Sequence, residues 1–413
     1  MNRRDFLTGG VAGLAVGGAV GYVARGAPAQ KIAEAPPAQA PAPPPQPSAA
    51  KPAAPAAPAV VKTIREYKMV TSWPKDAPGL GTAAERFART VEKASEGRIK
   101  IKVFAAGELV PALKCNDAVQ DGAADFYHSA DYYYQGKMSG YSFFTAVPAG
   151  FSASEINAWI YHGGGQALWD EIGAQFGIKH LPCGNTGHQA GGWFKKEIKS
   201  LDDLKGLKMR IPGLGGDVVR ALGGEPVTLA LTDILPAFEN GTVDAAEWIG
   251  PWNDLALGFQ RVAKNYYLPG FHEPGSVLSL GINKKLWDGF SETDKLIVSA
   301  CAGAENGVSL AEFNANNAAA LETLITKDDV KIREFSDEMF KAIFAAARDV
   351  VAQVGAKDPL SKKVYDGYMK FRKTMLGWTQ VADRAYFNKR ALVDFYAPAP
   401  KPPADNPPPP ASR

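Results

Sequence analysis

The chain has 413 residues with 46 basic and 43 acidic side chains, and its formal net charge of +3 arises from signs that are mixed along the sequence. This near-neutral balance shows no dense basic stripe, which argues against a nucleic-acid-binding protein. The three cysteines, Cys115, Cys183 and Cys301, are odd in number and widely separated, so a disulfide framework is not expected, and one bridge or buried free thiols stay open.

The N-terminus carries an export signal. Arg3 and Arg4 precede a Gly- and Ala-rich apolar run over residues 8–23, and a small-residue cleavage site follows around Ala27. Paired arginines before a weakly hydrophobic segment are typical of twin-arginine export, which delivers a folded chain to the periplasm. Retention of this segment as an N-terminal anchor stays open, although it is short and Gly-rich for a spanning helix.

Composition divides the chain into four parts. Residues 27–61 are dominated by Ala and Pro and residues 397–413 by Pro, so neither stretch has the apolar side chains that folding requires. We expect a signal or anchor at 1–26, a disordered spacer at 27–61, a folded body at 62–396 and a disordered tail at 397–413. The body is long enough for two domains. Its expected parts are lobe I at about 62–187 and 285–330, lobe II at about 188–284, and C-terminal helices at about 337–396.

Strands and helices alternate through the body. Residues 64–72 and 99–104 alternate as strands, and residues 79–94 between them place apolar side chains at helical spacing. The alternation predicts an α/β fold, with a parallel sheet and helices on its faces. Further strands are expected at 122–128, 178–184, 207–211, 225–229 and 277–283, and further helices at 110–121, 154–176, 213–222, 291–324, 337–354 and 358–396.

Two loops that follow strands carry candidate ligand-binding groups. Tyr132 and Tyr134 belong to a run of three tyrosines, of which at least one must face the core or the surface. Asn185 and Gln189 lie in a Gly-rich loop, residues 185–193, whose backbone can approach a ligand closely. Gln189 either offers its carbonyl oxygen to a cation or bonds its own backbone in a turn.

Arg210 lies near the carboxyl end of the strand at 207–211. Ligands bind beyond the carboxyl ends of strands in open parallel sheets, and the planar guanidinium group matches a carboxylate through two parallel hydrogen bonds. The alternative is an ion pair with Asp217 or Glu225.

Residues 232–254 are interpreted as a short helix capped by Thr232, a turn, and a strand over 242–249. Glu247 near the end of this strand is flanked by apolar side chains, where an unpaired carboxylate is costly. Either a basic side chain or a cation compensates its charge, and the carbonyl of Trp248 would be a further ligand of such a cation.

A nucleophile, a base and an orienting residue do not occur at a recognisable spacing, and the five histidines form no metal-binding box. Glu273, in a corner bounded by Pro and Gly, is either a second carboxylate of the site or a turn residue. An arginine for a carboxylate, side-chain oxygens for a cation and aromatic walls predict a pocket that holds a small anion without reacting it. Two lobes in an exported chain fit a receptor that closes on its ligand.

Three stretches carry a resemblance to a known family. Residues 183–189 with 192–194, residues 208–213 and residues 243–251 resemble the extracytoplasmic solute receptors of TRAP transporters, most of all the branch that binds 2-oxo acids such as pyruvate. The resemblance extends over about 67–395. It implies a two-domain periplasmic-binding-protein-like α/β fold with crossing strands and a long C-terminal helix, a receptor rather than an enzyme, and the small and large TRAP membrane subunits as partners.

The resemblance also implies roles for individual residues. Arg210 would hold the substrate carboxylate, Gln189 and Glu247 would give side-chain oxygens to a cation, and Trp248 would add its backbone carbonyl. Glu273 would make a further polar contact to substrate or cation. The remaining pocket candidates, on position only, are Asn185, Tyr132, Tyr134 and Trp193.

The identity of the cation depends on charge. One carboxylate with neutral oxygens fits Na⁺, which we expect, whereas a second carboxylate from Glu273 would favour Ca²⁺. The family branch also implies a homodimer through the final helix. Three alternatives stay open: a receptor for lactate or another 2-hydroxy acid with Ca²⁺, an exported cofactor-dependent oxidoreductase, and a ligand-sensing subunit.

Overall fold

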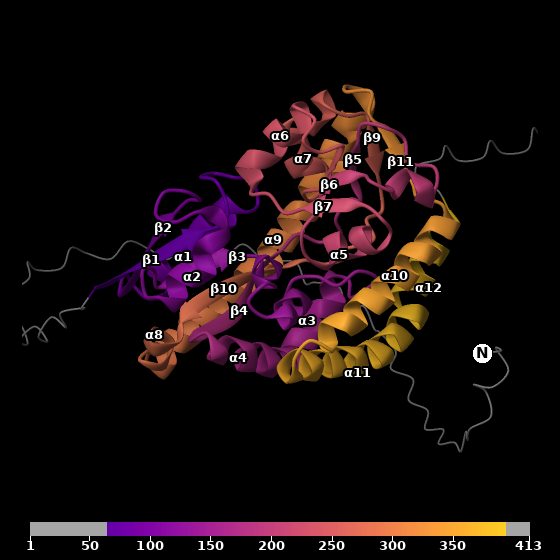
Figure 1. The fold of residues 1–413 in the computed structure, drawn as a ribbon. Coiled ribbons are helices and arrows are strands. Elements are labelled where there is room, and N and C mark those ends of the chain that lie inside the picture. The colour runs from indigo at the N-terminus through magenta and orange to yellow at the C-terminus, as the bar shows by residue number, and fades with distance from the viewer. Residues whose placement is uncertain (1–63, 394–413) are drawn as a thin grey trace, which may run out of the picture. The chain divides into compact units, whose positions relative to one another are not determined.

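The computed structural model describes residues 64–393, which form two mixed β-sheets surrounded by helices (Figure 1). The predicted export signal, the predicted spacer and the predicted tail lie outside these residues. Among residues 64–393, none of the helices has the length and apolar character that crossing a membrane requires.

The first sheet has five strands in the order β2-β1-β3-β10-β4. β1 pairs in parallel with β2 and β3, whereas β10 runs antiparallel between β3 and β4. α1 packs on this sheet through Phe87 and Val91, both fully buried at the helical spacing that the sequence predicts. The strands are β1 (Arg65–Thr71), β2 (Ile99–Phe104), β3 (Phe126–Ser129), β4 (Ile178–Asn185) and β10 (Val277–Asn283), and α1 spans Gly81–Ala94.

The second sheet has six short strands in the order β11-β9-β5-β8-β6-β7. β6 runs parallel to β7 and β8, while β5 lies antiparallel between β8 and β9. The strands are β5 (Gly192–Phe194), β6 (Lys208–Arg210), β7 (Glu225–Val227), β8 (Ala245–Ala246), β9 (Asn265–Tyr267) and β11 (Lys331–Arg333). The helices between them are α5 (Gly213–Ala221), α6 (Leu231–Glu239) and α7 (Pro251–Leu257).

Two short segments carry the chain between the sheets, residues 186–191 (the first crossing segment) and residues 268–276 (the second crossing segment), and residues 284–330 make a third, longer connection. Backbone hydrogen bonds tie the two segments together: the N–H of Gln189 donates to the carbonyl of Glu273 at 3.0 Å, and the N–H of Gly270 donates to the carbonyl of Gln189 at 3.1 Å. These bonds bring polar residues from distant parts of the sequence into one place.

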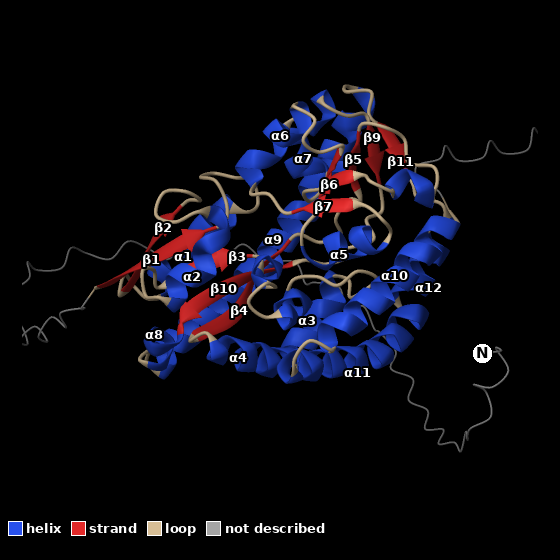
Figure 2. Cartoon of the chain, in the orientation of Figure 1, coloured by secondary structure: helices blue, strands red, loops and turns tan. Residues whose placement is uncertain are grey.

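α9 (Glu292–Thr326) is a continuous helix of 35 residues that begins with a hydrogen bond from the Asp294 N–H to the side chain of Ser291. The sequence predicts short breaks in this stretch, which the structure does not show. Its residues contact β4 in the first sheet and α7 beside the second sheet, so one rigid element lies along both (Figure 2).

The C-terminal helices cover one side of the described residues. Tyr368 is buried and its hydroxyl accepts a hydrogen bond from the N–H of Phe151, whereas Trp378 is 62% exposed, so only some of the aromatic residues of this region pack on the body. These helices are α10 (Asp337–Gly355), α11 (Pro359–Val381) and α12 (Asp383–Arg390). The remaining helices are α2 (Cys115–Gln120), α3 (Ala153–His162), α4 (Gly165–Gln175) and α8 (Lys284–Asp288).

Several predicted elements differ from the observed ones. The single helix at 154–176 is divided, because Gly164 has φ 87° and starts α4 anew. α6 begins at Leu231 after Ala230, and the Thr232 hydroxyl donates to its neighbour Asp233 instead of capping the helix. The predicted strand over 242–249 is reduced to Ala245–Ala246.

The three cysteines of the chain are buried and free, which is the second of the two states that the sequence left open. Burial raises the pKa of the Cys115 thiol to about 12, so this thiol stays protonated at neutral pH.

Candidate functional site

Arg210 and Glu247 lie side by side at the carboxyl ends of two parallel strands. Arg210 ends β6, and Glu247 directly follows β8. Because β6 and β8 run in parallel with Arg210 opposite Ala246, the Glu247 N–H donates to the Arg210 carbonyl at 2.9 Å. The placement agrees with the prediction that polar groups gather beyond the carboxyl strand ends.

The second crossing segment adds His272 and Glu273. His272 Nε2 lies 3.3 Å from Glu247 Oε1 and 3.9 Å from Glu273 Oε1. One ligand atom from each of these three side chains lies within 4.8 Å of the others. We call Arg210, Glu247, His272 and Glu273 the polar cluster.

The Arg210 guanidinium is held mostly by the protein itself. Its Nη1 donates to the Glu247 carbonyl at 2.6 Å and lies 3.2 Å from Glu247 Oε2, and its Nη2 donates to the Leu229 carbonyl at 3.3 Å. The indole of Trp248 lies 4.9 Å from the guanidinium carbon, which adds a cation–π contact. The ion pair of Arg210 with Asp217 or Glu225, which the sequence left open, does not form. Asp217 pairs with Arg220 instead.

The polar cluster is sealed from solvent, and burial controls its charge. Burial raises the pKa of Glu247 to about 8, although the positive charge of Arg210 acts to lower it. Burial and the negative charge of Glu247 raise the pKa of Glu273 to about 7. Burial lowers the pKa of His272 to about 4, so its imidazole is neutral at pH 7. One arginine therefore does not fully compensate the two carboxylates.

Several buried polar atoms of this region have no hydrogen-bond partner among the described residues. They are Glu247 Oε1, Arg210 Nε, both ring nitrogens of His272, Gln189 Oε1 and Asn185 Nδ2. Buried polar atoms are bonded in the great majority of cases, because leaving one unpaired costs about 1–3 kcal/mol. A cation bound together with a small anion would fit these atoms. Carboxylate and amide oxygens are the groups that Na⁺ and Ca²⁺ prefer to coordinate.

The first crossing segment places Gln189 next to the cluster, and Asn185 ends β4 just before this segment. The Gln189 side chain donates from Nε2 to Thr186 Oγ1 at 2.8 Å, which leaves its carbonyl oxygen unpaired. Asn185 Oδ1 accepts from the N–H of Gly187 at 2.8 Å, and the Asn185 N–H donates to Ser309 of α9 at 3.0 Å. The other role that the sequence left open for Gln189, a hydrogen bond from its side-chain amide to its own backbone, is not observed.

Tyr132 approaches the cluster, whereas Tyr134 does not. Tyr132 follows β3 and packs against Gly213 at the start of α5, and the negative charge of Glu273 helps burial to raise its pKa. Tyr134 instead packs on aromatic rings of the first-sheet core, and its hydroxyl donates to Ser129 at 2.8 Å. We assign Tyr134 a packing role.

Trp193 lies in the core of the second sheet. Its ring stacks on Tyr266 with 4.1 Å between centroids, and its Nε1–H donates to Asp254 at 2.9 Å. The structure thus brings together Arg210, Gln189, Glu247, Trp248 and Glu273, with Tyr132 beside them. It leaves out Trp193 and Tyr134, and Asn185 contacts Gly187 and Ser309.

His272 was not predicted as a site residue. The five histidines of the sequence show no metal-binding spacing, and His272 stands out only as the neighbour of Glu273 in a corner bounded by Pro and Gly. The available signal was its position next to Glu273 in a segment that leads back to the first sheet, but its approach to Glu247 depends on long-range pairing.

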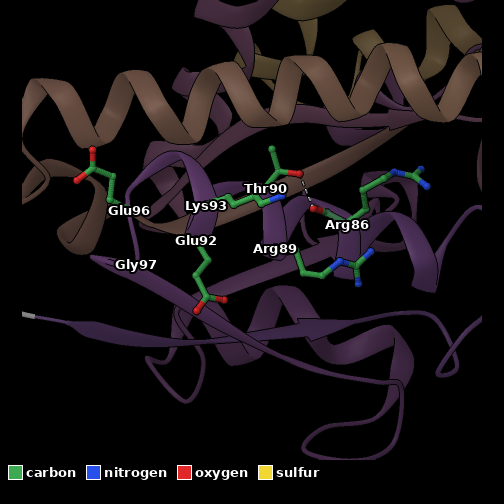
Figure 3. Close-up of a pocket in the computed structure, with 7 residues that line it drawn as sticks. All are labelled: Arg86, Arg89, Thr90, Glu92, Lys93, Glu96 and Gly97. Carbon is green, nitrogen blue, oxygen red and sulfur yellow. Dashed lines mark hydrogen bonds between the residues drawn. The ribbon is translucent and has the colours of Figure 1, made fainter. Parts of the chain in front are cut away.

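A surface hollow along α1 is a different kind of feature (Figure 3). It is lined mainly by charged side chains, among them Arg86, Arg89 and Lys93. Arg86 is already held by Glu305 and Glu312 of α9, each at 2.7 Å. We interpret this hollow as part of the surface that joins α1 to α9.

Comparison with known proteins identifies relatives of the whole body. The sequence model of the DctP family, described as bacterial extracellular solute-binding protein, family 7, matches residues 69–358. A monocarboxylate 2-oxoacid-binding periplasmic protein of Nostoc sp. is 42% identical over 324 residues, which cover 78% of this chain and 88% of that protein.

Two solved structures extend the comparison. A TRAP transporter solute-binding protein from Bordetella bronchiseptica, a mixed-occupancy dimer with copurified calcium and picolinate, is 37% identical with a TM-score of 0.78, covering 80% of this chain and 98% of that one. A TRAP periplasmic solute-binding protein from Pseudoalteromonas atlantica with bound sodium and pyruvate is 36% identical with a TM-score of 0.76, covering 79% and 99%.

Proposed function

The chain belongs to family 7 of the bacterial extracellular solute-binding proteins, the receptors of TRAP transporters, and on this premise we propose that it binds a small 2-oxo monocarboxylate such as pyruvate. The family consists of substrate-binding receptors and not of enzymes. We further propose that the receptor works in the periplasm after twin-arginine export and delivers its ligand to the two membrane subunits of the transporter.

One observation carries the ligand proposal: the sealed polar cluster holds an arginine and two carboxylates with unpaired buried atoms. We propose that Arg210 binds the ligand carboxylate and that Glu247, Glu273, Gln189 and the Trp248 carbonyl bind a cation. A 2-oxo acid would complete the site by giving the cation its carboxylate and its neighbouring oxygen. The nearness of Glu247 and Glu273 supports Ca²⁺ more than Na⁺, because calcium takes several anionic oxygens.

Support for a chelating ligand also comes from the neighbours. Pyruvate in the Pseudoalteromonas protein and picolinate in the Bordetella protein each carry a carboxylate next to a second donor atom, and each occurs with a cation. A 2-hydroxy acid such as lactate has the same arrangement and is the second candidate.

A comparison of three acids with equal carbon number distinguishes a 2-oxo acid from a 2-hydroxy acid as the ligand. Pyruvate, lactate and propionate differ only at the carbon next to the carboxylate, so a thermal-shift screen of the three reports on that position alone. The protein is first dialysed against a chelator, and each acid is added with Na⁺, with Ca²⁺ or with neither. We expect pyruvate with a cation to raise the melting temperature most and propionate to have little effect. An equal shift from all three acids would contradict the chelation proposal.

A further inference from the structure

His272 is an exception among the buried histidines. It is 1% exposed, and neither ring nitrogen has a hydrogen-bond partner among the described residues. His128, which is buried to the same degree, shows the usual arrangement: the Trp73 indole N–H donates to its Nδ1 at 2.8 Å, and its Nε2 lies 3.0 Å from the Cys183 carbonyl. The unpaired nitrogens of His272 indicate a partner that residues 64–393 do not supply.

The geometry directs His272 Nε2 at the two carboxylates. It lies 3.3 Å from Glu247 Oε1 and 3.9 Å from Glu273 Oε1, and one ligand atom of each residue lies within 4.8 Å of the others. Atoms that ligate one ion at about 2.0–2.5 Å must lie within about 4–5 Å of one another, so the three groups can share a single cation.

Packing holds the imidazole in this position. A methyl group added at Gly215 of α5 would lie 2.9 Å from His272 Cβ, so α5 closely approaches the histidine from one side. The ring of the neighbouring Phe271 lies edge-on to the imidazole at 5.3 Å. A side chain that is fixed before a ligand arrives loses little conformational freedom on binding it.

We propose that His272 is a nitrogen ligand of the cation that Glu247 and Glu273 hold, and that this third donor gives the receptor affinity for first-row divalent ions such as Mn²⁺. This inference rests on the cation of the proposed function and deepens it. Imidazole nitrogen is a good ligand for first-row divalent ions such as zinc, iron and nickel, and carboxylate oxygen for manganese, whereas Na⁺ and Ca²⁺ select oxygen. The site would therefore accept a wider range of cations than a site built of oxygens alone.

The test uses Mn²⁺ as the probe. The background is a tag-free protein with His162→Gln and His188→Gln, since these two histidines are exposed and would bind metal adventitiously. Pulsed electron paramagnetic resonance of bound Mn²⁺ should show coupling to a histidine nitrogen, and His272→Gln in this background should abolish the coupling. The same change should weaken Mn²⁺ binding at least about tenfold, because losing a ligand costs no less than losing a supporting residue. Ca²⁺ affinity should change only a few-fold.

A second measurement needs no change at position 272. Labelling the background protein with ¹⁵N-histidine should alter the coupling pattern of bound Mn²⁺, whether or not His272→Gln folds. Mn²⁺ bound without any histidine coupling, while pyruvate and Ca²⁺ still bind, would overturn this inference and leave the proposed function standing. Absence of binding by every cation, with or without pyruvate, would overturn both.

Discussion

Arg210 has to satisfy two demands. It neutralises part of the charge of Glu247 within a sealed region, and in the proposed function it also holds the ligand carboxylate. An ion pair alone would be consistent with a purely structural role. The unpaired Glu247 Oε1 and Arg210 Nε distinguish this cluster from a closed structural pair, because a pair kept only for stability would satisfy its buried atoms.

A double-mutant cycle separates the two roles of Arg210. Arg210→Ala should lower the free energy of unfolding by about 3–5 kcal/mol, because it leaves Glu247 buried without its partner. Adding Glu247→Gln should recover much of this stability, since the unpaired charge is removed. Neither variant should bind pyruvate in calorimetry. Pyruvate affinity that is unchanged in Arg210→Ala would remove Arg210 from the ligand site.

His128 gives a prediction for acid stability. Burial lowers its pKa from 6.5 to about 4, so the unfolded chain binds a proton at this residue in a pH range where the folded chain does not. The contribution of neutral His128 to the free energy of unfolding is therefore fully present above pH 6.5. It falls by roughly 3 kcal/mol in total as the pH falls through 4.

The measurement compares wild type with His128→Gln, which can still accept from Trp73 and donate to Cys183. The stability advantage of the wild type should shrink as the pH falls from 6.5 to 4. The exposed His162→Gln serves as the control and should track the wild type. A difference between wild type and His128→Gln that is constant with pH would be inconsistent with a buried neutral imidazole.

At the scale of elements, the sequence predicts the helices and strands whose residue pattern is visible within the element itself. The alternation over residues 99–104 predicts β2, and the strand expected at 277–283 is β10, both with the observed bounds. β8 shrinks to two residues because its length is set by pairing with β5 and β6, which the local sequence does not reveal. The approach of His272 to Glu247 was missed for the same reason: the contact depends on how β8 and the second crossing segment meet.

The start of α5 gives an element-scale prediction. Gly213 has φ 59°, and an added methyl group would lie 3.1 Å from the ring of Tyr132, which follows a strand of the other sheet. Gly213→Ala should lower both stability and pyruvate affinity, because the loop must shift away from Tyr132. Gly241→Ala is the matched control: φ is 82° there, but the added group has no neighbour within 4 Å.

The control should cost about 1–2 kcal/mol from backbone strain alone, with pyruvate affinity unchanged. Gly213→Ala should cost about 1–3 kcal/mol more, since it adds overpacking to the same strain. Equal stability losses together with equal pyruvate affinities would show that the contact between Tyr132 and Gly213 has no role in the site.

At the scale of the whole molecule, two crossing segments and α9 join two sheets, and the polar cluster lies at the crossing. This arrangement supports the expected pair of lobes. Closure of the lobes would bury the ligand at the place where the polar cluster is buried. The division into lobes stays a prediction from the sequence, as does the export route.

The C-terminal helices bear on the homodimer that the resemblance to the family implies. The end of α11 and α12 expose large apolar side chains, including Trp378 at 62% and Phe387 at 52% exposure. Light scattering after size exclusion should show a dimer for the wild type and a monomer for Trp378→Ser/Phe387→Ser, because burying such side chains drives association. Leu296→Ser removes an exposed apolar residue of α9 and should stay dimeric. A wild-type monomer at micromolar concentration would contradict the proposal.

The most direct test of the central claim is a calorimetric titration of the chelator-dialysed receptor with pyruvate, with and without saturating Ca²⁺. If one cation bridges Glu247, Glu273 and the ligand, the two binding events are thermodynamically linked, and Ca²⁺ should strengthen pyruvate binding by the same factor by which pyruvate strengthens Ca²⁺ binding. We expect this factor to be at least about tenfold, within the usual range of such couplings. Pyruvate affinity that is identical with Ca²⁺, with Na⁺ and with neither would contradict the account.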